Sequence, residues 1–381
     1  MDKRITNMLQ SLEQWFSTNG LAGFDPYDAK GLPHLLFAQR HRLTRAALNI
    51  LLEGAPRASR WLLRVKPTVN AKGLALLMDA LINRFETTGD QHYLEQAQET
   101  GQWLLTHGAD WRADVYAWGY PFNWQSRVMI PRGTPSSVVT AFVLQAILHL
   151  AKHRPEIGSP LVYDKIARFF AYSLNRLPEG CFSYTPTDTF RVHNANLFSV
   201  WSLLKLAMLT GEPSLKSLAM PALRYTIDQQ GSDGEFGYWG DELDHPVIDN
   251  FHTGYVIRSL HRIHKLAPET ELMPVISKAM DYYLERLFED DFPKDQVGRL
   301  YPINIHTLAE VILVYCELPS HRQQMESKLE RVVAFLHDTM QYRPGRFAYK
   351  YYPWHKVKMP YFRWNQAWTY NALTALERVV S

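Results

Sequence analysis

Two kinds of helix are predicted to alternate along the chain. In the first kind, apolar residues occupy most positions after a start that is rich in small or polar residues. Six segments share this pattern, and their starts lie 53 to 63 residues apart. They are residues 72–80, 135–148, 193–206, 250–264, 303–315 and 363–376. A unit that recurs at this spacing through the whole chain indicates a repeat architecture.

Between these segments, apolar residues recur every three or four positions and the other positions are polar or charged. This pattern is typical of helices that are buried on one side. Such helices are predicted within residues 93–108, 161–177, 214–230, 275–288 and 324–340. Each apolar helix is joined to the amphipathic helix after it by a short turn containing Gly or Pro, as at 210–213. The reverse connections are long and rich in aromatic residues.

This asymmetry of the connections predicts the fold. Six inner and six outer helices in alternation are expected to close into an all-α (α/α)6 toroid, with the long aromatic loops gathered on one face. Strand signals are weak and confined to the loops, where residues 347–354 suit a short hairpin arm. The sequence contains no linker-like segment, so one catalytic-type domain is predicted over 1–381. In it, residues 1–33 form an N-terminal helix and a candidate lid loop.

Composition narrows the classes of function. With 46% apolar and 21% charged residues, the chain is not intrinsically disordered. A net charge of +3 is too small for a dedicated nucleic-acid-binding surface, and no uncharged apolar stretch is long enough to span a membrane. Two cysteines form neither a disulfide framework nor a four-thiolate zinc site. Because the N-terminal residues lack a signal-peptide core, we expect a cytoplasmic protein. No Cys or His stands at metal-ligand spacing near His252 and the sequence has no Gly-rich phosphate loop, so we expect neither a metal nor a cofactor.

Aromatic residues make up 13% of the chain, and many stand beside Asn, Arg and His where the inner helices begin. In a toroid all inner helices present their N-termini, with free N–H groups and partial positive charge, on the same face. Aromatic rings stack on the apolar face of a sugar, while polar side chains bind its hydroxyl and acidic groups. We therefore expect a saccharide site formed by Tyr120, Trp124, Arg127, Arg132, His193, Asn194, Asn196, Trp239, Asn250, Asn304, His306, Arg363, Trp364 and Gln366.

The candidate catalytic residues concentrate around the fourth inner helix. They are Asp249, His252, Tyr255, Asp241 and Glu242. Structural roles compete with catalytic ones here, because Asp249 is also placed to cap that helix. The histidines His193, His252 and His306 also suit core positions bonded to neighbouring loops. The segment 23–31, GFDPYDAKG, fits either an Asx-type turn or a lid over the cavity.

Several segments resemble a family of α/α-toroid proteins of exopolysaccharide and surface-polysaccharide biosynthesis, within the six-hairpin glycosidase superfamily. They are GFDPYDAKG, WGYPFNWQSR with GTPSSVVTAF, HNANLFSVWSLL and, above all, DNFHTGYVIRSL. The resemblance extends from residue 23 to residue 368 and implies the toroid fold, a glycan substrate and partners in polysaccharide assembly. Toroid unsaturated-uronyl hydrolases place a catalytic Asp near the start of an inner helix, and toroid sugar epimerases use histidines that face the cavity. Asp249 and the three histidines are similarly placed.

Three functions agree with these observations. The leading hypothesis is acid–base cleavage of glycosidic bonds in an acidic saccharide, with Asp249 and either Asp241 or Glu242 as the two carboxylates. The first alternative is a uronate lyase or a C5- or other sugar epimerase, in which His or Tyr removes a proton. The second is a non-catalytic, glycan-binding scaffold. The expected partner is an acidic oligo- or polysaccharide, with no nucleic acid and no membrane span.

Overall fold

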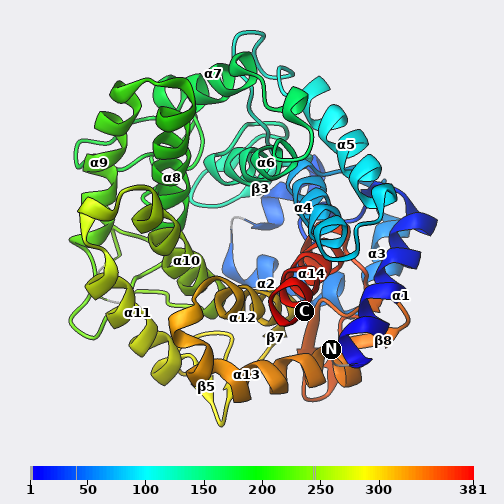
Figure 1. The fold of residues 1–381 in the computed structure, drawn as a ribbon. Helices are drawn as coiled ribbons and strands as arrows, with labels where there is room; N and C mark the ends of the chain where they lie inside the picture. Colours follow the sequence, from blue (N-terminus) through cyan, green and yellow to red (C-terminus); the bar gives the residue numbers. More distant parts are fainter. Residues whose placement is uncertain (1–2, 40, 243, 245) are drawn as a thin grey trace.

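The computed structural model describes residues 3–39, 41–242, 244 and 246–381. Figure 1 shows a closed ring of helices in two layers. The inner layer consists of α4 (Ala71–Thr88), α6 (Ser137–Leu150), α8 (His193–Thr210), α10 (Asn250–Leu266), α12 (Ile305–Glu317) and α14 (Trp368–Val380), the last preceded by the π-helical turn η7 (Phe362–Ala367). The outer layer consists of α1 (Lys3–Asn19), α5 (Gln91–Thr106), α7 (Pro160–Arg168), α9 (Pro213–Ile227), α11 (Met273–Arg286) and α13 (Arg322–Phe335). The π-helical turns η3 (Phe169–Ser173) and η6 (Leu336–Met340) extend α7 and α13. The predicted (α/α)6 toroid is confirmed.

The ring closes where the first and last inner helices pack side by side. The amide of Asn83 in α4 donates a hydrogen bond to Thr374 in α14 at 3.3 Å. Arg84 links three helices, because it pairs with Glu13 of α1 at 2.7 Å and with Glu377 of α14 at 2.5 Å. The N-terminal helix therefore takes the sixth outer position and holds both ends of the chain together.

The two layers differ in burial as their sequence patterns predict. Helix α4 is buried without interruption from residue 71 to residue 83, because it contacts α6, α14 and α5 on different sides. In α13, by contrast, the buried residues are confined to one stripe, Met325, Leu329, Val332 and Val333. A helix enclosed on several sides must be apolar nearly all round, whereas an outer helix needs only one apolar stripe.

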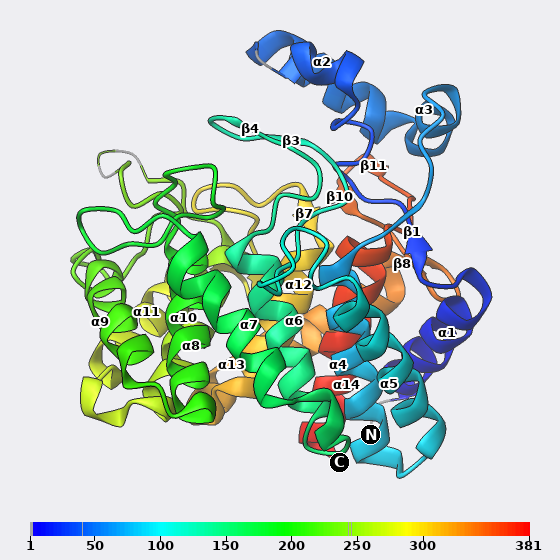
Figure 2. The ribbon, with the colours of Figure 1, turned by 90° about the horizontal axis from the view of Figure 1, so that it is seen from above.

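Short turns connect each inner helix to its outer partner. Gly89 and Gly211 end α4 and α8 with φ of +75° and +70°, a left-handed conformation that favours glycine. Three other inner-to-outer turns contain the 3₁₀ turns η2 (Pro155–Ile157), η4 (Pro268–Thr270) and η5 (Pro319–His321). These turns lie on the face opposite the long loops (Figure 2).

The strands that the described residues form in the long loops are short and antiparallel. The pairs are β1 (Ala22–Gly23) with β2 (Thr68–Val69), β3 (Trp124–Gln125) with β4 (Met129–Ile130), β5 (Phe288–Glu289) with β6 (Phe292–Pro293), and β8 (Gln341–Arg343) with β9 (Arg346–Phe347). A three-stranded sheet has the order β11 (His355–Lys356), β10 (Lys350–Tyr352), β7 (Ile303–Asn304). The hairpin β10–β11 begins within the predicted segment 347–354 and ends two residues beyond it.

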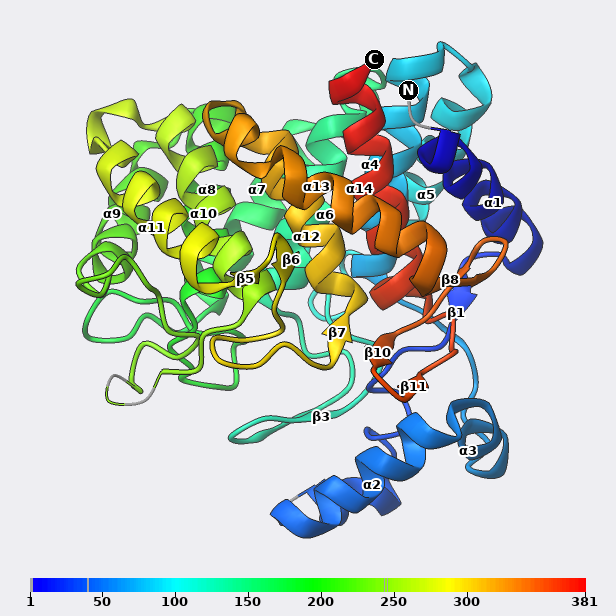
Figure 3. The same ribbon diagram turned by 90° about the horizontal axis from the view of Figure 1, so that it is seen from below.

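One part of the fold lies outside the sixfold pattern. The 3₁₀ helix η1 (Pro33–Gln39) and the helices α2 (Arg42–Gly54) and α3 (Pro56–Leu62) stand away from the ring over the loop face (Figures 2 and 3). The repeat, from which the helices were predicted, does not extend to these residues. Across the described ranges, no helix combines the length and apolarity needed to cross a bilayer.

Candidate active site

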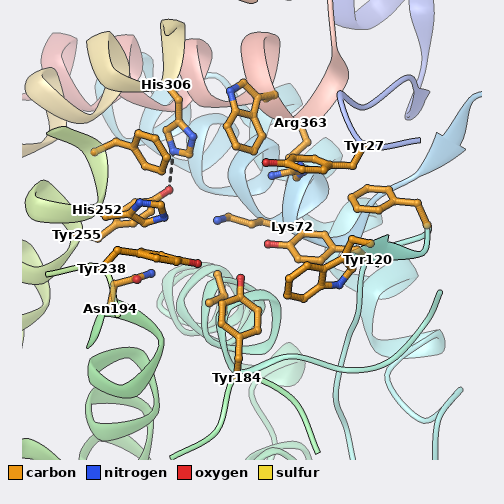
Figure 4. A pocket seen from close by; sticks show the side chains of 15 residues that line it. Tyr27, Lys72, Tyr120, Tyr184, Asn194, Tyr238, His252, Tyr255, His306 and Arg363 are labelled. Carbon is orange, nitrogen blue, oxygen red and sulfur yellow. Dashed lines mark hydrogen bonds between the residues drawn. The ribbon is translucent and has the colours of Figure 1, made fainter. Parts of the chain in front are cut away.

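A cavity opens at the centre of the ring on the loop face (Figure 4). It contains about 690 Å³ of empty space, its open mouth included. Six lining residues share one position, because each is the second residue of an inner helix, counting η7 as the start of the last. They are Lys72, Val138, Asn194, Phe251, His306 and Arg363. The other lining residues are Tyr27, Tyr120, Phe122, Trp124, Tyr184, Tyr238, His252, Tyr255 and Trp364.

His252 is held by the carboxylate of Asp249. One oxygen, Oδ1, accepts a hydrogen bond from the backbone N–H of His252 at 2.8 Å and so caps α10. The other, Oδ2, lies 2.6 Å from His252 Nδ1. A hydrogen on Nδ1 satisfies this contact and leaves Nε2 of the neutral ring free to accept a proton. The dyad therefore has the arrangement of an oriented general base.

His306 forms a second polar pair in the cavity. Its Nε2 shares a hydrogen bond of 2.6 Å with the hydroxyl of Tyr255, drawn in Figure 4. Burial, followed by the charges of Lys72 and Arg363, lowers the pKa of His306 well below its usual range. Burial also raises the pKa of Tyr255 well above its usual range. Both groups are therefore neutral near pH 7.

The side chain of Lys72 points into the middle of the cavity (Figure 4). Its residue is 3% exposed, and among the described residues no carboxylate forms an ion pair with it. The Nζ atom instead lies over the rings of Phe142, Trp368 and Tyr255, at 4.1, 5.2 and 5.5 Å from their centroids. Burial, followed by the charge of Arg363, lowers the pKa of Lys72 well below its usual value. An anion in the cavity would supply the missing partner.

The positive charge of Arg363 is balanced by a buried carboxylate. Its Nε and Nη2 atoms donate to Asp25 at 2.7 and 2.9 Å, and both side chains are nearly fully buried. Its guanidinium also lies over the rings of Tyr120 and Trp364, 5.0 and 4.8 Å from the centroids. Asp25 Oδ1 accepts from the backbone N–H of Tyr27 as well, at 3.2 Å. The carboxylate of the predicted Asx-type turn therefore also holds Arg363 in the cavity wall.

Aromatic rings and hydroxyls form the rest of the wall. The phenols of Tyr27, Tyr120, Tyr184 and Tyr238 all reach the cavity (Figure 4), and burial raises the pKa of each. They are neutral hydrogen-bond donors and acceptors at pH 7. The amide oxygen of Asn194 is buried without a partner among the described residues. Flat rings with unsatisfied polar groups between them suit a ligand that is itself both apolar-faced and rich in hydroxyls.

No known family model matches the sequence, and no curated protein matches it significantly. Solved structures do match. A sugar epimerase from a ruminal bacterium superposes with a TM-score of 0.62 at 11% identity, over 83% of this chain and 90% of that one. An unsaturated glucuronyl hydrolase from Bacillus sp. GL1 gives 0.63 at 13% identity, over 98% and 95%. A GH76 α-mannanase from Bacteroides thetaiotaomicron gives 0.60 at 9% identity, over 81% and 86%. The chain has the fold of these α/α toroids. The predicted resemblance is thus confirmed at the level of the fold.

Eight of the residues predicted for the site line the toroid cavity. They are Tyr120, Trp124, Asn194, His252, Tyr255, His306, Arg363 and Trp364. Asp249 lies behind His252 and contacts it, without lining the cavity itself. The histidines at the starts of α10 and α12 therefore meet at one site, as the ring geometry requires.

The other predicted carboxylates lie on the surface of the loop face. Asp241 and Glu242 both pair with Arg127, each at 2.6 Å, and the guanidinium of Arg127 lies 3.9 Å from the ring centroid of Trp239. None of these four residues lines the cavity, and Arg132 is exposed. Among the described lining residues there is no carboxylate, so the carboxylate pair that sequence reasoning placed in the cavity is not there.

Five further predicted residues form hydrogen bonds with loops, with the outer helix α9 or with their own helix. They are His193, Asn196, Asn250, Asn304 and Gln366. Asn250, for example, donates to the carbonyl of Leu287 at 3.1 Å. The ring of His193 packs on Tyr225, and burial lowers the pKa of this histidine to about 4. For His193, the core position that competed with a catalytic role describes these contacts.

Sequence reasoning missed several lining residues, above all Lys72 and the phenols Tyr184 and Tyr238. A signal for Lys72 exists in the repeat. His306 and Arg363 were predicted for the site, and each is the second residue of its helix. Lys72 is the second residue of the first inner helix, so it could have been predicted in the same way. No comparable signal marks the two tyrosines, since they lie in loops of unequal length.

Proposed function

We propose that the toroid is an epimerase of acidic saccharides, which removes and returns the proton on the carbon atom bonded to a carboxylate. The arrangement of His252 carries this proposal. It reaches a cavity whose described lining contains no carboxylate, and Asp249 orients it at 2.6 Å. Paired carboxylates suit glycosidic cleavage, whereas an oriented imidazole suits removal of a proton from carbon. Sugar epimerases are among the proteins that share the fold.

The reaction can be written with the residues of the cavity. Nε2 of His252 takes the proton, and Asp249 stabilises the imidazolium that forms. The electron pair left on the carbon moves into the bond to the carboxylate carbon, and negative charge collects on the carboxylate oxygens. The ammonium of Lys72 stabilises that charge. A proton returned to the opposite face inverts the carbon. Tyr120, which lies across the cavity from His252 (Figure 4) and which burial keeps protonated, is the candidate donor; solvent restores its proton and takes up the proton held by His252.

The acidic character of the substrate rests on Lys72. A buried ammonium without an ion-pair partner is unfavourable, and its lowered pKa expresses that cost. Arg363 is not available to bind an anion, because Asp25 occupies it in bidentate fashion. A substrate carboxylate at Lys72 would restore the protonated lysine beside the group on which the reaction creates negative charge. The stacked aromatic wall, including Trp124 and Trp364, is suited to the sugar ring.

The experiment is hydrogen exchange in D₂O. The full chain is incubated with uronate-containing oligosaccharides, and deuterium at the carbon beside the carboxylate is measured by NMR. We expect incorporation without cleavage in the wild type and its loss in His252→Gln. Asp249→Asn should slow the exchange by about 10²-fold, since general-base catalysis contributes about that much or more. The control is Asp164→Asn, which removes a half-exposed carboxylate of outer helix α7.

Each other outcome identifies a different function. New reducing ends without deuterium would show hydrolysis, and a product with an ultraviolet-absorbing C=C bond would show elimination. Saturable binding of the saccharides without any reaction, unchanged in His252→Gln, would show a binding protein. Any of these three results would overturn the proposed epimerisation.

A further inference from the structure

The helix α2 carries two apolar faces on opposite sides. At about 3.6 residues per turn, Leu48 and Leu52 project from one side, and they are buried in a small cluster with Ala29 and Ala38. Leu43 and Ile50 project from the other side and are 83% and 74% exposed. One face is therefore used to hold α2 on the protein, and the other has no partner within the described chain.

The inner side of this region is fixed firmly to the loop face. Arg60 of α3 pairs with Asp28 at 2.7 Å, and both side chains are buried. Glu53 of α2 accepts from Lys350 at 2.8 Å and from the hydroxyl of Tyr352 at 3.0 Å. Because these contacts come from both helices, the exposed apolar face has a defined orientation relative to the ring.

The same region is strongly basic. Residues 41–66, here called the arm, contain six Lys or Arg and one Glu, which gives +5 in a chain whose net charge is +3. Arg60 is buried, and the other five basic residues are exposed. These are Arg42, Arg45, Arg57, Arg64 and Lys66. No ion pair joins any of the five to a carboxylate of the described residues.

Two exposed tryptophans add to this surface. Trp61 at the end of α3 is 83% exposed, and its neighbour Leu62 is exposed too. Trp354, in the turn between β10 and β11, is 81% exposed, and this hairpin contacts the arm through Glu53. Tryptophan side chains of this kind favour the interface between water and lipid.

We propose that the arm binds the surface of an anionic lipid bilayer, with its apolar residues inserted among the headgroups and its cations on lipid phosphates. A helix with an exposed apolar stripe, accompanied by exposed cations and nearby tryptophans, has the properties of an interfacial anchor. The arm stands over the face on which the cavity opens (Figures 2 and 3). Binding would therefore bring the cavity near saccharides attached to the bilayer.

Charge distinguishes a lipid surface from a second copy of the chain. In a twofold contact the same patch meets itself, so the five exposed cations of one arm would face five of the other. Such like charges oppose association, whereas an anionic membrane attracts each cation that approaches its surface. The described arm offers no exposed acidic residue in compensation, since its Glu53 is paired with Lys350.

The test is co-sedimentation of the full chain with vesicles. We expect binding to vesicles of equal parts phosphatidylcholine and phosphatidylglycerol, and none to phosphatidylcholine alone. The double variant Arg42→Gln/Arg45→Gln should bind about 25-fold more weakly, because each cation near an anionic surface contributes about fivefold. Leu43→Gln/Ile50→Gln should also lose binding. All four side chains are exposed, so folding, checked by circular dichroism, should be unaffected.

The matched control is Leu161→Gln/Met208→Gln, which removes two exposed apolar side chains from α7 and α8 and should bind as the wild type does. Equal sedimentation with both vesicle types, or equal binding by the arm variants, would refute the proposal. A dimer in analytical ultracentrifugation that Leu43→Gln/Ile50→Gln abolishes, without vesicle binding, would show instead that the arm joins two copies.

Discussion

Replacing Lys72 by Met should make the toroid more stable while it weakens substrate binding. Methionine matches the length of the lysine stem and packs readily against aromatic rings. The substitution removes an ammonium that is buried in the cavity without an ion-pair partner among the described residues. Residues that serve binding at the expense of stability are expected at functional sites.

The magnitude follows from two opposing contributions. Burial of one ion costs several kcal/mol in real proteins. The ring contacts of Lys72, at 4.1, 5.2 and 5.5 Å, recover about 1 kcal/mol each. With a burial cost of about 5 kcal/mol, the net cost of the lysine is about 2 kcal/mol, and Lys72→Met should raise the free energy of unfolding by that amount.

The gain should depend on pH in one direction. The pKa of Lys72 is lowered in the folded state, so below the folded pKa the lysine is charged in both states and its full cost is present. As pH rises from there to the unfolded pKa near 10.4, the unfolded chain holds more protons and the wild type gains stability. The advantage of the variant should therefore be largest at low pH and close by about pH 10.4.

The assay is urea unfolding of both proteins at several pH values, followed by tryptophan fluorescence. Calorimetry with an acidic saccharide and with its neutral, reduced counterpart measures binding on the same samples. We expect the variant to lose affinity for the acidic saccharide alone. A variant that is less stable than the wild type at neutral pH, or a stability difference that is constant with pH, would refute the reasoning about Lys72.

Two other predictions concern ion pairs away from the reacting atoms. Although burial alone would lower it, hydrogen bonds to Asp79 and Glu86 raise the pKa of His149 to about 9. His149→Gln should therefore lose about 3 kcal/mol of unfolding free energy below pH 6.5, and this loss should vanish above pH 9. Thermal unfolding scans at several pH values measure it, and a loss that does not change with pH would contradict the prediction. Asp25→Asn leaves Arg363 charged and buried, and urea unfolding should show a loss of about 3–5 kcal/mol. An unchanged midpoint would mean that another group compensates Arg363.

The fold could be predicted from sequence because burial in a toroid is periodic. An inner helix such as α8 is enclosed by its neighbours and must be apolar on most faces, and this requirement returns once per hairpin. The arm could not be predicted in the same way. Its helices α2 and α3 do not belong to the repeat, and the apolar residues Leu43 and Ile50 are exposed. Periodicity there indicates a helix but not what that helix contacts.

The site was predictable only where the repeat positions its residues. Asn194, His306 and Arg363 occupy the second position of their helices, so the fold alone brings them to the cavity. The roles of Arg127 and Arg363 depend on partners from distant segments, and the sequence does not reveal those. Arg127 turns to Asp241 and Glu242 on the surface, whereas Arg363 turns inward to Asp25.

Asp249 shows why cap and catalyst could not be separated by sequence. The two roles exclude each other only if the side chain makes a single contact, and a carboxylate has two oxygens. Oδ1 caps α10 through the backbone N–H of His252, and Oδ2 reaches the imidazole of the same residue. Asparagine is about as good a cap as aspartate, yet it has no charge to stabilise an imidazolium. The cap therefore fixes the backbone at the residue whose side chain the other oxygen orients, and helix formation itself positions the proposed base.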